Sequence, residues 1–232
     1  MSEIKDAADR GFLWLELQKP YDLKEISRFT LVYTLWDREN KWLDLLKESL
    51  QNFQGKNVRD IARTLFSAST TGISPTNIVT WVEEQQNEDG SWGEKDVYDT
   101  TYSLTALANT GRSNPTGCKW LINNFSPKWE HPGTVSLIIT SLVKQGNTGT
   151  YDAFINQKVQ WLLDNEEVEG GWKYIATTTI VIDALISAGH PEATYNAVKW
   201  ILKNQNPDGS WGKEGKSKNT TAMVLACFAG VR

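Results

Sequence analysis

Tryptophan recurs at a nearly constant interval along this chain. Five of the 11 tryptophans are separated by 39, 39, 41 and 39 residues, and they are Trp42, Trp81, Trp120, Trp161 and Trp200. Four of these are followed 9 or 11 residues later by a second tryptophan, at Trp92, Trp129, Trp172 and Trp211. A repeat of this length is typical of proteins built from similar supersecondary units, so we expect the fold to repeat with the tryptophans.

Each repeat is predicted to be a helical hairpin. Between Asn196 and Gln205 the apolar residues follow the spacing of an amphipathic helix. An Asp-Gly turn ends that helix, and the next segment is apolar on most of its circumference, as in a buried helix. The six expected pairs cover residues 3–18 with 24–38, 40–53 with 57–70, 75–86 with 97–110, 115–125 with 132–144, 151–166 with 174–188, and 191–205 with 218–230.

The last expected helix, from Thr220 to Val231, is as apolar as those in the middle of the chain. An open stack of hairpins needs polar caps at its ends. The apolar last helix has no such cap, and it would be covered if the first helix pair packed against it. The sequence therefore predicts one all-α domain over residues 1–232, a closed (α/α)6 toroid with inner and outer helix rings, roughly 20 Å tall.

Composition narrows the class of protein. The 24 basic and 28 acidic residues give a net charge of −4, which argues against nucleic-acid binding. The apolar stretches are too short to cross a membrane. Cys118 and Cys227 match no metal-binding or redox spacing, and the start of the sequence has no apolar run typical of a secretory signal. These features predict a cytoplasmic protein without a transmembrane segment.

Two repeats read WVEEQQNEDGSWG and WILKNQNPDGSWG, starting at Trp81 and Trp200. They resemble the QW motif of the squalene cyclase and protein prenyltransferase superfamily, and the resemblance implies the (α/α)6 toroid. A glutamine amide can bond free backbone groups at a helix end while a tryptophan ring covers it. We therefore expect structural roles for Gln86, Trp92, Gln205 and Trp211, rather than a tryptophan platform for sugars.

The resemblance implies two chemistries. Protein prenyltransferases hold zinc with Asp, Cys and His on inner helices, but here His190 and Cys118 fall on or before outer helices, so no metal site is predicted. Class II terpene cyclases protonate an alkene with an Asp-x-Asp-Asp-Thr motif at the start of an inner helix. This chain reads Asp96-Val97-Tyr98-Asp99-Thr100-Thr101 at that place.

Tyr98 stands where the family has its catalytic acid. A phenol with a pKa near 10 is a much weaker acid than a carboxylic acid, so Asp96 or Asp99 would have to act with a raised pKa. Asp96, Tyr98 and Asp99 are therefore the predicted catalytic residues. In the competing interpretation Asp99, followed by two threonines, caps the helix. Capping explains Asp96 less easily.

The starts of six inner helices would meet at one rim, where His131 and Tyr174 are predicted to contact substrate. Below the rim, the predicted lumen residues are Phe29, Tyr33, Phe66 and Tyr102. Aromatic faces stabilise carbocations, although these rings also fit an ordinary core, and His131 also fits a surface turn. Asp183 interrupts an apolar run, so it is either bonded between helices or exposed as an acid in the lumen.

The sequence thus favours a class II terpene-cyclase-like enzyme that cyclises a linear isoprenoid, by protonation or by binding a preformed cation. No cofactor is expected, and Mg²⁺ enters only if the substrate carries a diphosphate. The alternatives are a non-catalytic toroid that binds a lipid-like ligand or a partner protein, and another lyase or cyclase on the same scaffold. An open apolar cavity reaching Asp96 would favour the enzyme, and a lumen filled with side chains would favour the binding protein.

Overall fold

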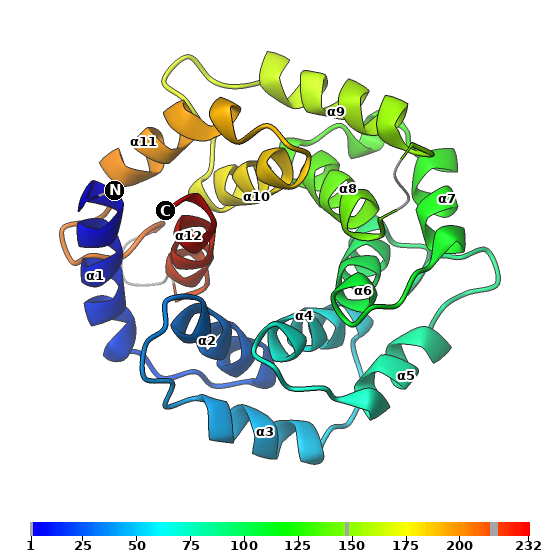
Figure 1. Ribbon diagram of the computed structural model, residues 1–232, viewed down its shortest axis with the longest axis horizontal. Helices are drawn as coiled ribbons and strands as arrows, with labels where there is room; N and C mark the ends of the chain where they lie inside the picture. Colours follow the sequence, from blue (N-terminus) through cyan, green and yellow to red (C-terminus); the bar gives the residue numbers. More distant parts are fainter. Residues whose placement is uncertain (1, 147–148, 214–217) are drawn as a thin grey trace.

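The computed structural model describes residues 2–146, 149–213 and 218–232, and in these ranges the chain is helical without an extended strand (Figure 1). The outer helices are α1 (Ser2–Glu16), α3 (Leu43–Gln51), α5 (Thr76–Glu84), α7 (Pro115–Asn123), α9 (Asp152–Asp164) and α11 (Tyr195–Lys203). The inner helices are α2 (Leu23–Leu35), α4 (Val58–Thr70), α6 (Val97–Asn109), α8 (Pro132–Lys144), α10 (Ile175–Ser187) and α12 (Lys218–Val231). Two short 3-10 helices, η1 (Pro127–Trp129) and η2 (Pro191–Thr194), lie in connections.

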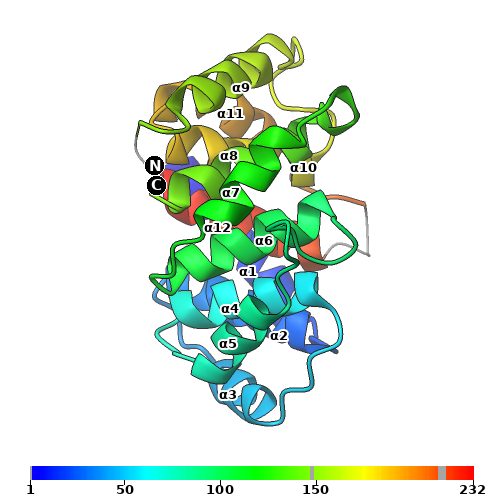
Figure 2. The same ribbon diagram turned by 90° about the vertical axis from the view of Figure 1, so that its right-hand side faces the viewer.

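The six inner helices form a closed ring. Each contacts the next in chain order, and α12 contacts α2, so the two ends of the chain lie side by side (Figure 1). The outer helix α1 also contacts α12, which covers that apolar helix as the sequence predicted. Seen from the edge, the molecule is much thinner along the ring axis than across it (Figure 2). The predicted all-helical class and the closed arrangement of hairpins are confirmed.

The inner helices all run in the same direction. Side chains from helix starts meet one another, as Arg59 of α4 does with Asp99 of α6. Side chains from helix ends also meet, as Asn109 of α6 does with Ser69 of α4. Contacts between helix starts also join α2 to α4, α6 to α8, α8 to α10 and α12 to α2. The inner helices therefore begin on one face of the ring, which we call the N-terminal rim.

In three repeats, the second tryptophan joins the outer helix of its hairpin to the inner helix through hydrogen bonds. Each indole N–H donates to a carbonyl near the end of the preceding outer helix, and each backbone N–H donates to a threonine hydroxyl of the next inner helix. The indole bonds are Trp92 to Val82 at 2.7 Å, Trp172 to Leu162 at 3.0 Å and Trp211 to Ile201 at 2.9 Å. The accepting hydroxyls are those of Thr100, Thr178 and Thr221.

The two glutamines of these repeats bond backbone as well. Gln86 Nε2 donates to the carbonyl of Gly90 at 2.9 Å, and Gln205 Nε2 donates to the carbonyls of Gly209 and Ala7. The bond to Ala7 joins the last hairpin to the first helix of the chain. The structural roles expected for these residues therefore agree with their contacts.

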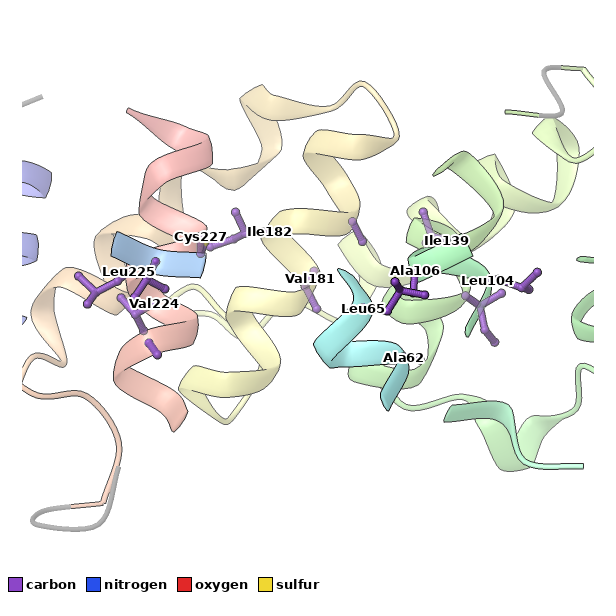
Figure 3. Packing of buried hydrophobic residues seen from close by; sticks show 14 of the residues in the cluster. Ala62, Leu65, Leu104, Ala106, Ile139, Val181, Ile182, Val224, Leu225 and Cys227 are labelled. Carbon is purple, nitrogen blue, oxygen red and sulfur yellow. The ribbon is translucent and has the colours of Figure 1, made fainter. Parts of the chain in front are cut away.

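The hydrophobic core lies between the two rings rather than on the ring axis. Many of its fully buried side chains come from inner helices, on the faces turned toward the outer ring and toward neighbouring inner helices (Figure 3). Those labelled in Figure 3 are Ala62, Leu65, Leu104, Ala106, Ile139, Val181, Ile182, Val224, Leu225 and Cys227. This arrangement leaves one face of each inner helix for the lumen.

Candidate functional site

A cavity of about 470 Å³ occupies the centre of the ring, and every residue that lines it belongs to an inner helix. Its volume lies within the range of about 300–1,000 Å³ that is typical of small-molecule sites. The lumen is therefore open rather than filled with side chains.

Most of the lining residues occupy equivalent places, five, eight and twelve residues after the first residue of their helix. Because the helices are parallel and begin at one rim, equivalent places form layers across the ring. The first layer is Arg28, Arg63, Tyr102, Leu137, Ile180 and Met223. The middle layer is Leu31, Phe66, Thr105, Thr140, Asp183 and Ala226, and the third layer is Leu35, Thr70, Asn109, Lys144, Ser187 and Gly230.

The first layer, nearest the N-terminal rim, is chemically two-sided. The neighbouring helices α2, α4 and α6 contribute Arg28, Arg63 and Tyr102, whereas the other three helices contribute apolar side chains. The guanidinium carbon of Arg63 lies 4.0 Å from the centre of the Tyr102 ring. A ligand in this layer would meet positive charge on one side and hydrocarbon on the other.

Asp183 is the acidic residue of the cavity lining. Its side chain is exposed to the cavity, and no described residue forms a hydrogen bond or an ion pair with it. Enclosure by the inner helices raises the pKa of Asp183 to about 7, against the opposing charge of Lys144. Near neutral pH this carboxyl therefore exchanges readily between its acid and its carboxylate.

A second group of ionisable residues lies at the N-terminal rim. Arg59 on α4 donates from Nη2 to Asp96 Oδ1 at 2.7 Å and from Nε to Asp99 Oδ1 at 2.8 Å. Asp96 also accepts the backbone N–H groups of Tyr98 and Asp99 at 2.8 and 3.0 Å. We call Arg59, Asp96 and Asp99 the rim cluster.

The structure corrects the expected division between these two carboxylates. Helix α6 begins at Val97, so Asp96 is its N-cap and Asp99 lies in the first turn. Burial raises the pKa of Asp99 despite the opposing effect of Arg59. A Cβ placed on Gly93 would lie 2.0 Å from Asp99 Oδ2, and the φ of Gly93 is +62°. The Asp99 carboxylate is thus held against backbone that only glycine permits.

The remaining rim residues have local partners. Tyr98 Oη lies 2.9 Å from Thr134 Oγ1, and His131 is the N-cap of α8, where its Nδ1 accepts the N–H of Gly133 at 3.2 Å. Tyr174 precedes α10 and is 56% exposed. The cavity lining includes none of these residues and none of the rim cluster, so the open space reaches Asp183 and not Asp96.

Two of the four aromatic lumen predictions are wrong. Phe29 and Tyr33 are buried against outer-ring aromatics, with ring centres 5.9 Å from Trp42 and 5.2 Å from Phe12. The cavity-facing side of α2 carries Lys24, Ser27, Arg28, Leu31 and Leu35 instead. On the other helices, Phe66 and Tyr102 do line the cavity.

The sequence analysis singled out neither Arg63 nor Lys144. Both residues can be found by aligning the six inner helices on their first residues. In that alignment the cavity-lining residues of different helices occupy the same positions. In the described ranges, no group of three or more His, Cys, Asp or Glu residues is placed to hold a metal ion. The cofactor expectation stays a prediction.

Parts of this sequence are similar to known proteins. Residues 136–227, from α8 into α12, match the family described as the squalene-hopene cyclase C-terminal domain. An ent-copalyl diphosphate synthase of Streptomyces sp. (strain KO-3988) is 27% identical over 148 residues, covering 56% of this chain and 29% of the relative. A squalene–hopene cyclase of Bradyrhizobium diazoefficiens is 25% identical over 146 residues, covering 59% of this chain and 20% of the relative.

These matches show that much of the chain is similar to squalene and terpene cyclases. Another relative, an enfumafungin synthase of Hormonema carpetanum, is 24% identical over 177 residues, covering 57% of this chain and 13% of the relative. The matched part of the chain spans less than a third of the length of these curated relatives. Among its described residues, no helix has the length and apolar character needed to cross a membrane.

Proposed function

We propose that this chain binds an isoprenoid in its central cavity and cyclises it by protonating an alkene, with Asp183 as the proton donor. The sequence similarity to squalene and terpene cyclases supports this proposal. The observation that carries it is the environment of the Asp183 side chain. A carboxyl that faces a mostly apolar cavity without a described bonding partner, and whose pKa is about 7, is available as an acid in a large fraction of molecules near neutral pH.

The proposed reaction transfers the Asp183 proton to one alkene carbon and leaves a carbocation at the other carbon. Attack by the next alkene closes a ring, and loss of a proton from the cyclised cation yields the product. The carboxylate left on Asp183 is a base that can take up that proton. Substrate and product are then isomers, so the cycle consumes no cofactor.

Phe66 is placed to stabilise the cation in this scheme. It shares the middle layer with Asp183, and α4 lies across the ring from α10. Lys144 Nζ lies 5.6 Å from the centre of the Phe66 ring, so a positive charge already reaches this ring. Cation–π attraction is stronger when the cation is removed from water, as it would be in a filled cavity.

The rim residues Asp96, Asp99 and Tyr98 form the second candidate for the proton donor. Arg59 forms an ion pair with each of the two carboxylates, and this engagement argues for a structural role. This pairing also favours an alternative function, a toroid that binds a hydrophobic molecule without catalysis. The partners proposed in both cases are isoprenoids or similar hydrophobic small molecules.

The test is to incubate the protein with farnesyl diphosphate, geranylgeranyl diphosphate and squalene, with and without Mg²⁺, and to identify products by gas chromatography and mass spectrometry. We expect Asp183→Asn to lower the rate about 10²–10⁴-fold, the usual contribution of a general acid. The matched control is Asp152→Asn, which removes an exposed carboxylate from α9.

Several outcomes discriminate between the candidates. Full activity of Asp183→Asn, with loss of activity in Asp96→Asn or Asp99→Asn, would move the acid to the rim. Binding of these isoprenoids without any product would favour the non-catalytic toroid. The absence of both binding and product would reject the cavity as an isoprenoid site.

A further inference from the structure

Three basic side chains gather at the rim side of the cavity, on the adjacent helices α2 and α4. Arg28 and Arg63 belong to the first layer, and Lys24 lies one helical turn closer to the rim than Arg28. We call Lys24, Arg28 and Arg63 the basic cluster. Among the described residues, Arg63 has a buried Nε without a hydrogen-bond partner, and Arg28 forms a single hydrogen bond, from Nη1 to Asn219 Oδ1 at 2.8 Å.

Carboxylates do not balance this cluster. Asp60 Oδ1 lies 3.6 Å from Lys24 Nζ and 3.5 Å from Arg63 Nη1, so two cations share one carboxylate at long distance. Glu25 is engaged by Lys218 at 2.7 Å. Among the described residues, no acidic group forms an ion pair with Arg28. Burial lowers the pKa of Arg28, and the positive charge of Arg63 lowers it further.

Enclosed positive charge is costly unless an anion accompanies it. Guanidinium groups present their N–H donors in a planar fork that matches the oxygens of phosphate groups. The starts of the inner helices also point at this end of the cavity, and helix N-termini favour negative charge. These properties define a site for a compact group with several anionic oxygens.

We propose that the basic cluster binds a phosphate or diphosphate head group, and that the hydrocarbon tail of the same ligand runs across the ring into the middle layer. The opposite side of the first layer, formed by Leu137, Ile180 and Met223, supplies apolar contact for that tail. Asp183 then lies one layer beyond the head group. The placement of the ligand's hydrocarbon tail rests on the proposed function. The inference names the substrate class, which is an isoprenoid phosphate ester rather than a neutral hydrocarbon.

The test is calorimetric titration with pyrophosphate, farnesyl diphosphate and farnesol. We expect Arg28→Gln and Arg63→Gln each to weaken farnesyl diphosphate and pyrophosphate binding at least tenfold, and farnesol binding less than twofold. The matched control is Lys144→Gln, which removes a cation from the third layer of the same cavity and should change pyrophosphate affinity less than twofold. Added salt should weaken binding of the two anions only.

A second measurement guards against variants that fail to fold. Pyrophosphate should raise the melting temperature of the wild type and of Lys144→Gln, and should leave that of the Arg28→Gln/Arg63→Gln double variant unchanged. Without ligand, the far-ultraviolet circular dichroism of the double variant should match that of the wild type, which checks that it folds although it loses the Arg28 bond to Asn219 and the Arg63 pair with Asp60.

Failure of this inference can be told apart from failure of the proposed function. Wild type that does not bind pyrophosphate, equal affinity for farnesol and farnesyl diphosphate, or an equal loss in Lys144→Gln would each overturn the head-group site. If squalene is still cyclised in an Asp183-dependent way, the proposed function survives. Tight, arginine-dependent binding of farnesyl diphosphate without any product would instead support the head-group site and overturn the proposed cyclase activity.

Discussion

At the scale of single residues, Asp183 is the carboxyl whose surroundings differ most from water. It faces the cavity without a described bonding partner, and its pKa is raised from 3.8 to about 7. Folding therefore has to accommodate either a bound proton or an enclosed negative charge. A site that serves packing alone has no need of such a group, which is why it points to function.

The raised pKa of Asp183 predicts how stability depends on pH. Between about pH 4 and pH 7 the folded chain binds this proton more tightly than the unfolded chain, so the free energy of unfolding falls as the pH rises. We expect Asp183→Asn to gain stability relative to the wild type from pH 5 to pH 8 in urea titrations. Asp152→Asn should follow the wild type. A constant difference between Asp183→Asn and the wild type would contradict the enclosed position of the carboxyl.

Arg59, unlike Asp183, has charged partners, because it forms ion pairs with two carboxylates at once. We expect Arg59→Gln to lower the free energy of unfolding by about 1–2 kcal/mol, since it leaves Asp96 and Asp99 side by side. Replacing Asp99 with Asn in that background should recover part of the loss. Lys47→Gln, which breaks an exposed pair with Asp44, should cost less than about 0.5 kcal/mol. Equal losses in Arg59→Gln and Lys47→Gln would show that the rim cluster contributes nothing beyond a surface pair.

At the scale of elements, each hairpin depends on a turn that brings it close to a neighbour. Gly209 has a φ of +90°, and a Cβ at this position would lie 2.5 Å from the carbonyl oxygen of Arg10 on α1. The turn of the last hairpin therefore seats directly on the first helix. Only a residue without a side chain fits there.

Gly72 offers a matched comparison, with a φ of +81° and no atom within 4 Å of an added Cβ. We expect Gly72→Ala to cost about 1 kcal/mol through backbone strain alone, and Gly209→Ala to cost clearly more. Thermal and urea unfolding measure both. Equal losses in the two variants would mean that α1 and the last turn separate easily, against the close contact described here.

The helices themselves follow from the sequence, because apolar spacing and Asp-Gly turns mark their extents. The predicted helix 132–144 coincides with α8, and the other predicted helices agree with the structure within a few residues. The lumen faces could not be predicted in the same way. Arg28 and Phe29 are adjacent and lie on different faces of α2, toward the cavity and toward Trp42, so the assignment requires the rotation of the helix within the ring. The interpretation of Asp99 as the cap is wrong although the predicted start at residue 97 is right, because a helix that begins at Val97 has Asp96 as its N-cap.

At the scale of the whole molecule, closure of the ring creates the site. The apolar character of the last helix predicted closure, and the contact of α12 with α2 confirms it. Stacking of consecutive hairpins sets Arg28 of α2 near Arg63 of α4, and closure of the ring sets Asp183 across the lumen from Phe66. No local motif announces these juxtapositions, so sequence reasoning located the rim residues and missed the basic cluster.

The central claim is that the lumen of the ring holds the ligand, with its head group at Arg28 and Arg63 and its tail directed toward Asp183. A crystal structure of the protein with farnesyl thiodiphosphate, an analogue that reacts slowly, tests this most directly. The account predicts thiodiphosphate oxygens within hydrogen-bonding distance of both guanidinium groups, and hydrocarbon in contact with Leu137, Ile180 and Met223. An analogue bound at the rim cluster of Arg59, Asp96 and Asp99, or outside the ring, would contradict it.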